Sequence, residues 1–425
     1  MSVTTIAKRL PAGMEPLIRA FLAYASAEAM TRIVRLVAII VIASFTSPLI
    51  LGTAALSLSI FELVRVLANA GIGQRIIVAT DEELDAVCNT ALRLFWGVCA
   101  LVAIIQMLIA AILGLGFAQA DAAIMLAVLS VVYFIMPPGL VQVFLLMRDG
   151  NLATTARIGA SQTILDHILT MILVVVWPSA WAIALPKLLT APVWTVMVRR
   201  ARSWSNKPAA GFAPLSEFRF YAAGILGSEI MSALRAQADK LLIGAIFGTK
   251  VLGIYYFAFN AGLGIAQSLV SAFGIVLFPH LARIKTSAAR LLEARRVTGF
   301  GLLFFAPIII AQAALAPIYV PILFGETWAS SSFYVSILAL GGIPLFAAAS
   351  LSALYRAAQS TGREAQISAA ATIAALTGLV IGAQFSFEAA CAGYVTGLAL
   401  TFIPKAIADL ATTANHTSSL ERIPS

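Results

Sequence analysis

Ionisable side chains stand inside segments that are otherwise apolar, and these residues are the ones best able to do chemistry. Glu62 and Arg65 are separated by three positions, whereas Arg35 and Lys187 have no acidic residue three or four positions away. Side chains at i,i+3 or i,i+4 share one face of a helix and can pair. A cation without such a partner is able to hold an anionic ligand. The candidate residues are Glu28, Arg32, Arg35, Glu62, Arg65, Asp166, His167, Lys187, Arg235 and Asp239.

The segments that must position these side chains are long and apolar. Hydrophobic residues make up 61% of the 425 residues and charged residues 11%, and the mean hydropathy is +0.96. Such a composition is typical of membrane proteins. About 20 apolar residues are enough to cross a bilayer as a helix. The pattern predicts an all-α membrane protein with twelve spans, near residues 21–44, 52–72, 94–114, 124–146, 158–176, 181–198, 222–247, 252–279, 300–323, 333–354, 367–384 and 390–410.

Basic residues alternate between the gaps that separate these spans. Of the 28 Lys and Arg residues, 21 fall before the first span, near or beyond the end of the last, or in every second gap, and only Lys250 falls in the remaining gaps. This asymmetry follows the positive-inside rule and predicts that both termini are cytoplasmic. The net charge of +9 therefore reflects topology, and we expect no nucleic-acid partner.

The largest hydrophilic gap divides the chain nearly in half. We predict an N-terminal six-helix lobe over 1–198, a cytoplasmic linker over 199–217, a C-terminal six-helix lobe over 218–410, and a polar cytoplasmic tail over 411–425. A short internal repeat supports two pseudo-symmetric lobes, because Pro48 to Gly52 precedes the second span and Thr249 to Gly253 precedes the eighth. An even number of spans in each lobe makes such a repeat parallel.

Two interpretations of the charges in the spans stay open. A charge near the bilayer centre costs about 3 kcal/mol, so each must face protein or water. In the first interpretation, Glu62 with Arg65 and Arg235 with Asp239 neutralise each other and fix helix packing. In the second, the charges act in transport. The predicted cavity cations are Arg32, Arg35, Lys187 and Arg235, and the predicted coupling or structural pairs involve Glu28, Glu62, Arg65, Asp166, His167 and Asp239.

Soluble enzyme motifs are not found in the sequence. It carries no P-loop, no HExxH and no GxSxG motif, and its three cysteines lack metal-ligand spacing. We therefore predict no catalytic residues, no metal and no cofactor, and expect a protein that is not an enzyme.

Several stretches resemble the polysaccharide transporter family of oligosaccharide flippases (Wzx-type), in the superfamily that includes multidrug extruders. Residues 239–258 are similar to that family's D-x-x-x-I-G-x-x-x-G-x-x-x-L-G-x-Y-x-x-A signature, and Phe278-Pro279 matches the end of span eight. Phe324-Gly325 with Trp328 resembles its F-G-x-x-W motif, and the stretch from Tyr355 to Arg363 its A-x-G-R turn, with Thr361 in place of alanine. Pro48 to Gly52 resembles its P-x-x-x-G, without the arginine that commonly precedes it.

The resemblance implies a flippase that moves polyprenyl-pyrophosphate-linked oligosaccharide units across the bacterial cytoplasmic membrane for surface polysaccharide synthesis. Lipid-linked oligosaccharide and membrane lipids are the implied partners, with a polysaccharide polymerase and a chain-length regulator beside them. The sequence does not distinguish O-antigen, capsule and exopolysaccharide units. The alternatives are a multidrug-type cation-coupled efflux transporter and, from another class, a membrane-embedded polysaccharide polymerase or glycosyltransferase. A lipid II flippase is also a rival, but we expect such a protein to have two further helices.

Overall fold

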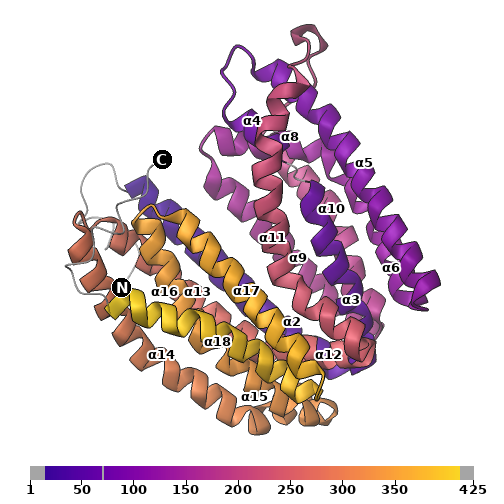
Figure 1. Ribbon diagram of the computed structural model, residues 1–425. Helices are drawn as coiled ribbons and strands as arrows, with labels where there is room; N and C mark the ends of the chain where they lie inside the picture. Colours follow the sequence, from indigo (N-terminus) through magenta and orange to yellow (C-terminus); the bar gives the residue numbers. More distant parts are fainter. Residues whose placement is uncertain (1–14, 69–70, 412–425) are drawn as a thin grey trace. The chain divides into compact units, whose positions relative to one another are not determined.

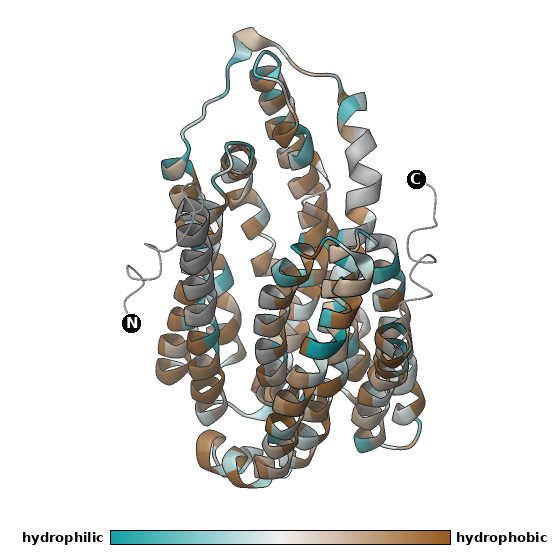
Figure 2. Cartoon of the chain, turned by 90° about the vertical axis from the view of Figure 1, so that its left-hand side faces the viewer, coloured by the Kyte–Doolittle hydropathy of each residue, from teal (hydrophilic) through white to brown (hydrophobic). Residues whose placement is uncertain are grey.

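The computed structural model describes residues 15–68 and 71–411, and every regular element in these ranges is a helix. Hydrophobic residues predominate along most of the length of the helices, and hydrophilic residues are frequent in the connections between them (Figure 2). This arrangement follows from the bilayer, in which a helix satisfies all of its backbone hydrogen bonds internally. The predicted all-α membrane architecture is confirmed.

The chain folds into two compact units, 1–46 with 53–237 and 47–52 with 238–425. The helices whose residues lie wholly or mostly in the first unit are α2 (Glu15–Phe45), α3 (Pro48–Arg65), η1 (Val66–Ala68), α4 (Ile72–Ile77), α5 (Leu84–Gly116), α6 (Ala120–Leu129), α7 (Val132–Ile135), α8 (Pro137–Arg148), α9 (Leu152–Val176), α10 (Ala180–Ala201), η2 (Pro208–Ala210) and α11 (Leu215–Phe247) (Figure 1). The segment predicted as a linker, 199–217, lies within this unit.

The second unit contains the remaining helices and the last turns of α11. They are α12 (Thr249–Ala258), the π-helix η3 (Phe259–Leu263), α13 (Gly264–Ala282), α14 (Ser287–Phe324), η4 (Glu326–Ser331), α15 (Ser332–Leu340), α16 (Gly342–Ala357), α17 (Thr361–Ala383) and α18 (Phe387–Ala411). Helices α17 and α18 lie side by side (Figure 1). Their backbones touch, because a Cβ atom at Gly378 would lie 2.2 Å from the carbonyl oxygen of Gly393. Small residues permit such close helix packing in membranes.

In the part of the chain that the structure describes, each predicted span coincides with a helix or with consecutive helices. Within the described residues, eight helices are long and apolar enough to cross a membrane, or nine if one bent pair counts as a span. The protein is thus a multi-pass membrane protein, and the count of twelve spans stays a prediction.

Proline and glycine set the breaks in these helices. Pro137 and Pro138 occupy the first turn of α8, and the predicted fourth span bends by 56° at this point. Proline lacks the backbone donor that a continuous helix needs. Gly248 and Gly325 end α11 and α14 with positive φ values of 84° and 89°, a backbone conformation that glycine adopts without strain because it has no Cβ atom.

The two copies of the internal repeat meet in the structure. A Cβ atom added at Gly52 would lie 1.8 Å from the carbonyl oxygen of Thr249, and one added at Gly253 would lie 1.8 Å from that of Pro48. Both close approaches lie inside the second unit, which includes residues 47–52. The reciprocal pattern means that the first turns of α3 and α12 cross with their backbones touching, which explains why each repeat ends in glycine.

Candidate functional site

Four charged side chains from three helices gather inside the first unit. Lys187 on α10 lies 2.9 Å from Asp166 on α9 and 3.7 Å from Glu62 on α3, measured from its Nζ to the nearest carboxylate oxygen. Arg65 donates to Glu62 from Nε and Nη2 at 2.9 and 2.7 Å. The four charges form one cluster with no net charge, which we name the first-unit charge cluster.

The cations of this cluster are more accessible than its anions. The side chains of Arg65 and Lys187 are 42% and 36% exposed, and that of Asp166 is 8% exposed. The Oδ1 atom of Asp166 is buried without a hydrogen-bond partner among the described residues. Charged groups on apolar helices are stable only where they face protein or water. The cluster therefore marks a partly exposed polar surface within the first unit.

The structure brings together some of the predicted site residues. The predicted i,i+3 pair of Glu62 and Arg65 is present, and Lys187 finds its partners on other helices. His167 follows Asp166 on α9 and is half-buried. Arg32 is half-buried and Arg35 exposed on α2, which packs against α9. The Glu28 side chain lies outside what the structure describes.

The i,i+4 spacing of Arg235 and Asp239 predicts a pair that the structure does not contain. Asp239 is buried and pairs with its neighbour Lys240 at 3.2 Å, while Arg235 is exposed. The buried face of α11 carries Asp239 and Lys240 into the second unit, so the nearest cation to the carboxylate is the adjacent lysine. Spacing along one helix could not have revealed which face is buried.

The signature over residues 239–258 is a packing unit. The hydroxyl of Tyr255 donates to Asp239 Oδ2 at 2.9 Å, and Ile243, Leu252 and Ala258 are fully buried. The F-G-x-x-W motif packs on the same segment, because the rings of Phe324 and Trp328 lie 4.9 and 4.2 Å from that of Phe257, centroid to centroid. The motifs that carry the family resemblance therefore hold the second unit together.

The segment predicted as a linker is fixed to the first unit by side chains of α5. Asn89, which is 1% exposed, donates to the carbonyl oxygens of Lys207 and Gly211 at 2.8 and 2.9 Å. Thr90 donates to the Ala213 carbonyl at 3.0 Å, and the Arg93 guanidinium stacks 3.6 Å from the Phe212 ring centroid. The sequence did not predict this anchoring, because the contacts join residues about 120 positions apart.

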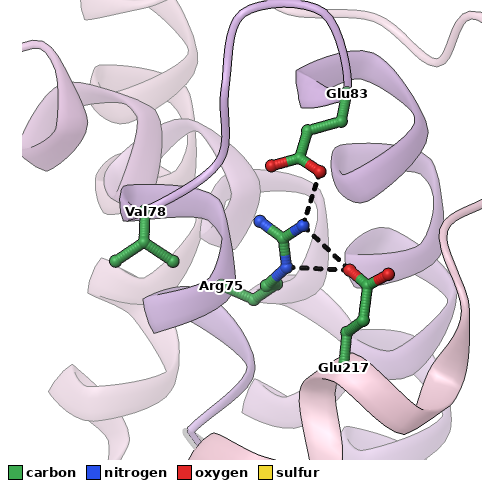
Figure 3. A pocket seen from close by; sticks show the side chains of 4 residues that line it. All are labelled: Arg75, Val78, Glu83 and Glu217. Atoms are coloured by element: carbon green, nitrogen blue, oxygen red, sulfur yellow. Dashed lines mark hydrogen bonds and ion pairs between the residues drawn. The ribbon is translucent and has the colours of Figure 1, made fainter.

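Arg75 on α4 joins the turn before α5 to the first turn of α11. Its guanidinium lies 2.8 Å from a carboxylate oxygen of Glu83 and 2.8 Å from one of Glu217. With Val78 these residues line an open pocket of about 410 Å³, and Figure 3 shows Arg75 between the two carboxylates. The arginine hydrogen bond holds the pKa of Glu83 below its usual 4.5, at about 2. The pocket has one cation against two anions, so it does not suit an anionic ligand.

Fold and site together define a multi-pass helical membrane protein with a charged cluster in its first unit, the class to which membrane transporters belong. The sequence profile of a family described as "Polysaccharide biosynthesis protein" matches residues 41–333, which is more than half of the chain. The chain belongs to this family. The resemblance drawn from the motifs is thereby confirmed at the level of the family.

Relatives of known pathway agree with this assignment. The chain is 24% identical over 300 residues to the lipopolysaccharide biosynthesis protein WzxC of Escherichia coli K12, covering 69% of this chain and 60% of that protein. It is 22% identical over 310 residues to the succinoglycan biosynthesis transport protein ExoT of Rhizobium meliloti, covering 72% of this chain and 62% of that protein. The chain thus spans about three fifths of the length of these relatives.

The fold is similar to two kinds of solved transporter structure. The lipid II flippase MurJ in an inward closed conformation superposes with a TM-score of 0.74 at 12% identity, over 93% of this chain and 88% of that one. An inward-facing multidrug resistance MATE transporter of the MOP superfamily superposes with a TM-score of 0.65 at 15% identity, over 95% of this chain and 99% of that one. At such identities the likeness establishes the fold.

Proposed function

We propose that the chain is a flippase that moves polyprenyl-pyrophosphate-linked oligosaccharide units across the bacterial cytoplasmic membrane. Family membership, together with relatives named for lipopolysaccharide and succinoglycan biosynthesis, supports a role in surface polysaccharide synthesis. A pyrophosphate and a polar glycan cannot enter hydrocarbon unaided, so their transfer needs a polar surface within the bilayer.

The observation that carries this proposal is the first-unit charge cluster. Arg65 and Lys187 are each partly exposed while they pair with Glu62 and Asp166. A pyrophosphate diester carries two negative charges, so it can replace the two carboxylates as the partner of these cations. Arg is suited to bidentate phosphate contact, and Lys acts as a point charge. Arg32, Arg35 and Arg235 complete the proposed set of cavity cations.

We infer the orientation from the distribution of basic residues. In this proposal both termini and the segment 199–217 face the cytoplasm, so the glycan would enter from that side and leave on the other. The isoprenoid tail stays in lipid throughout. A polymerase and a chain-length regulator are the proposed downstream partners, since they would consume and control the transferred units.

The test uses a strain that lacks the native copy. Surface polysaccharide and lipid-linked intermediates are measured with the wild-type chain and with an Asp166→Asn, Lys187→Gln double variant, which keeps the net charge of the cluster unchanged. We expect normal membrane abundance, at least about a tenfold loss of surface polysaccharide because one charge-assisted contact of about 1.5–3 kcal/mol is removed, and accumulation of lipid-linked units. An Asp149→Asn, Arg202→Gln variant removes an ion pair of 2.9 Å at a helix end and serves as the control.

Two results separate the function from the site. If a strain without the chain exports its polysaccharide normally, the proposed function is wrong. If export needs the chain but the cluster variant exports fully at normal abundance, the function stands and the cluster is a packing element only.

A further inference from the structure

The second unit contains an ion pair that is almost fully buried. The side chains of Asp239 and Lys240 are 1% and 7% exposed, and the ammonium lies 3.2 Å from Oδ1 of the carboxylate and 3.4 Å from Oδ2. Tyr255 donates its hydroxyl to Oδ2 at 2.9 Å. The carboxylate is thus held by a fixed hydrogen-bond donor on one side and by the lysine on the other.

The ammonium of Lys240 also faces an aromatic ring. Its Nζ lies 4.1 Å from the centroid of the Phe259 ring, within the range at which a ring face attracts a cation. Phe259 is the first residue of the π-helix η3, and this turn is fixed from α14, where Gln312 donates to the carbonyl oxygen of Gly262 at 2.9 Å. Single π-helical turns inside α-helices are frequent at functional sites.

We propose that Asp239, Tyr255 and Phe259 form a binding site for a small monovalent cation, which the chain fills with its own Lys240. A buried carboxylate beside an aromatic face is the chemistry that binds ammonium groups. The lysine is covalently tethered next to the carboxylate, so its effective concentration exceeds that of dissolved ions. Asp239 therefore binds no dissolved cation while Lys240 is in place. This inference does not depend on the proposed transport function.

Chemical rescue tests the site. Lys240→Ala removes a group with the size and charge of propylammonium. The full-length variant is purified in detergent with choline, a cation too large for the site, as the only other cation. We expect a lower melting temperature than wild type, and a saturable rise of at least about 2 °C when propylammonium is added. Neutral 1-propanol should give no such rise, and the wild type should not respond to propylammonium.

The carboxylate provides the matched control. An Asp239→Asn, Lys240→Ala variant retains the cavity without the anion, so propylammonium should not stabilise it. Equal stabilisation of the single and double variants, or none in the single variant, would overturn the proposal.

A second comparison covers the case in which Lys240→Ala does not accumulate. Lys240→Met keeps the shape of the side chain but leaves Asp239 without its counter-ion, so membrane abundance should fall several-fold. Asp239→Asn, Lys240→Met removes both charges and should return abundance to within about twofold of wild type. A double variant as depleted as Lys240→Met would show that Asp239 does not need a cation.

Discussion

Tyr255 and Asp239, the tyrosine and the aspartate of the family signature, are joined by a hydrogen bond of 2.9 Å between buried side chains. They lie on different helices, α12 and α11, on either side of the turn at Gly248. The bond gives a physical reason for their spacing of sixteen residues, because a turn that ends α11 at glycine brings the first turns of α12 back alongside it. The signature is thus a helix-hairpin element of the second unit.

The first prediction concerns this bond. Tyr255→Phe removes one partner of a buried carboxylate, so we expect the free energy of unfolding to fall by about 1–3 kcal/mol. Thermal melting of the purified protein measures the change. Tyr256→Phe is the matched control, because Tyr256 is only half-buried and no side-chain hydrogen bond joins it to another described residue. Equal effects of the two variants would contradict the role of the bond.

The sequence predicted the helices well because hydrophobic runs between basic gaps are long and regular. Wherever the structure describes the chain, the predicted spans coincide with helical segments. The sequence did not predict the ion pairs that depend on contacts between helices. The partners of Lys187 lie on α3 and α9, and the buried face of α11 selected Lys240 rather than Arg235 for Asp239. Neither relationship has a signature in local spacing.

The second prediction concerns the crossing of α3 and α12. Gly52→Ala would place a methyl group 1.8 Å from the carbonyl oxygen of Thr249, so the backbones must separate. We expect a loss of about 1–3 kcal/mol or more, seen as lower melting temperature and lower abundance, and the same for Gly253→Ala. Gly97→Ala is the control, since no atom lies within 4 Å of its added Cβ. A Gly52→Ala protein as stable as Gly97→Ala would show that the crossing is not required.

The third prediction concerns the anchoring of the segment 199–217. Asn89→Ala deletes two donated hydrogen bonds and an accepted one, which the Lys207 amide donates at 3.2 Å. Buried polar groups without partners are costly, so we expect the segment to detach and proteinase K to cleave between Trp204 and Ala213 several-fold faster. Asn151→Ala, at an exposed position, should cleave like the wild type. Unchanged cleavage of the Asn89 variant would mean that the backbone alone holds the segment.

The fourth prediction concerns pH. The pKa of Glu83 is lowered from 4.5 to about 2, chiefly by its hydrogen bond to Arg75. A carboxylate with a lowered pKa contributes stability that is present above its unfolded pKa and is lost as pH falls toward the folded value. The difference in melting temperature between wild type and Glu83→Gln should therefore be constant near neutral pH and shrink between about pH 4.5 and 2. Glu82→Gln, at the neighbouring exposed position, should show no difference. A gap that grows on acidification would contradict the Arg75 contact.

The last prediction concerns the first-unit charge cluster. The structure leads to a different expectation for Lys187→Gln than the sequence does. From the sequence, Lys187 lacks a local partner, which predicts that Lys187→Gln would accumulate normally. In the structure Lys187 neutralises Asp166 through its Oδ2 atom, and the Oδ1 atom has no hydrogen-bond partner among the described residues. Removing only the lysine leaves a buried carboxylate without compensation, which costs about 3–5 kcal/mol. We therefore expect Lys187→Gln to be depleted from the membrane and Asp166→Asn, Lys187→Gln to recover.

The comparison of abundance with export then separates packing from transport. If Lys187 acts only by neutralising Asp166, the double variant should recover both abundance and export. If Lys187 also holds the anionic substrate, abundance should recover while export stays low, because the neutral amides satisfy each other but no longer attract a phosphate. Arg65→Lys provides an internal comparison, since it keeps the charge but loses the bidentate geometry. Normal accumulation of Lys187→Gln alone would contradict the ion pair with Asp166, and membrane quantification of the single variant is therefore the measurement to make first.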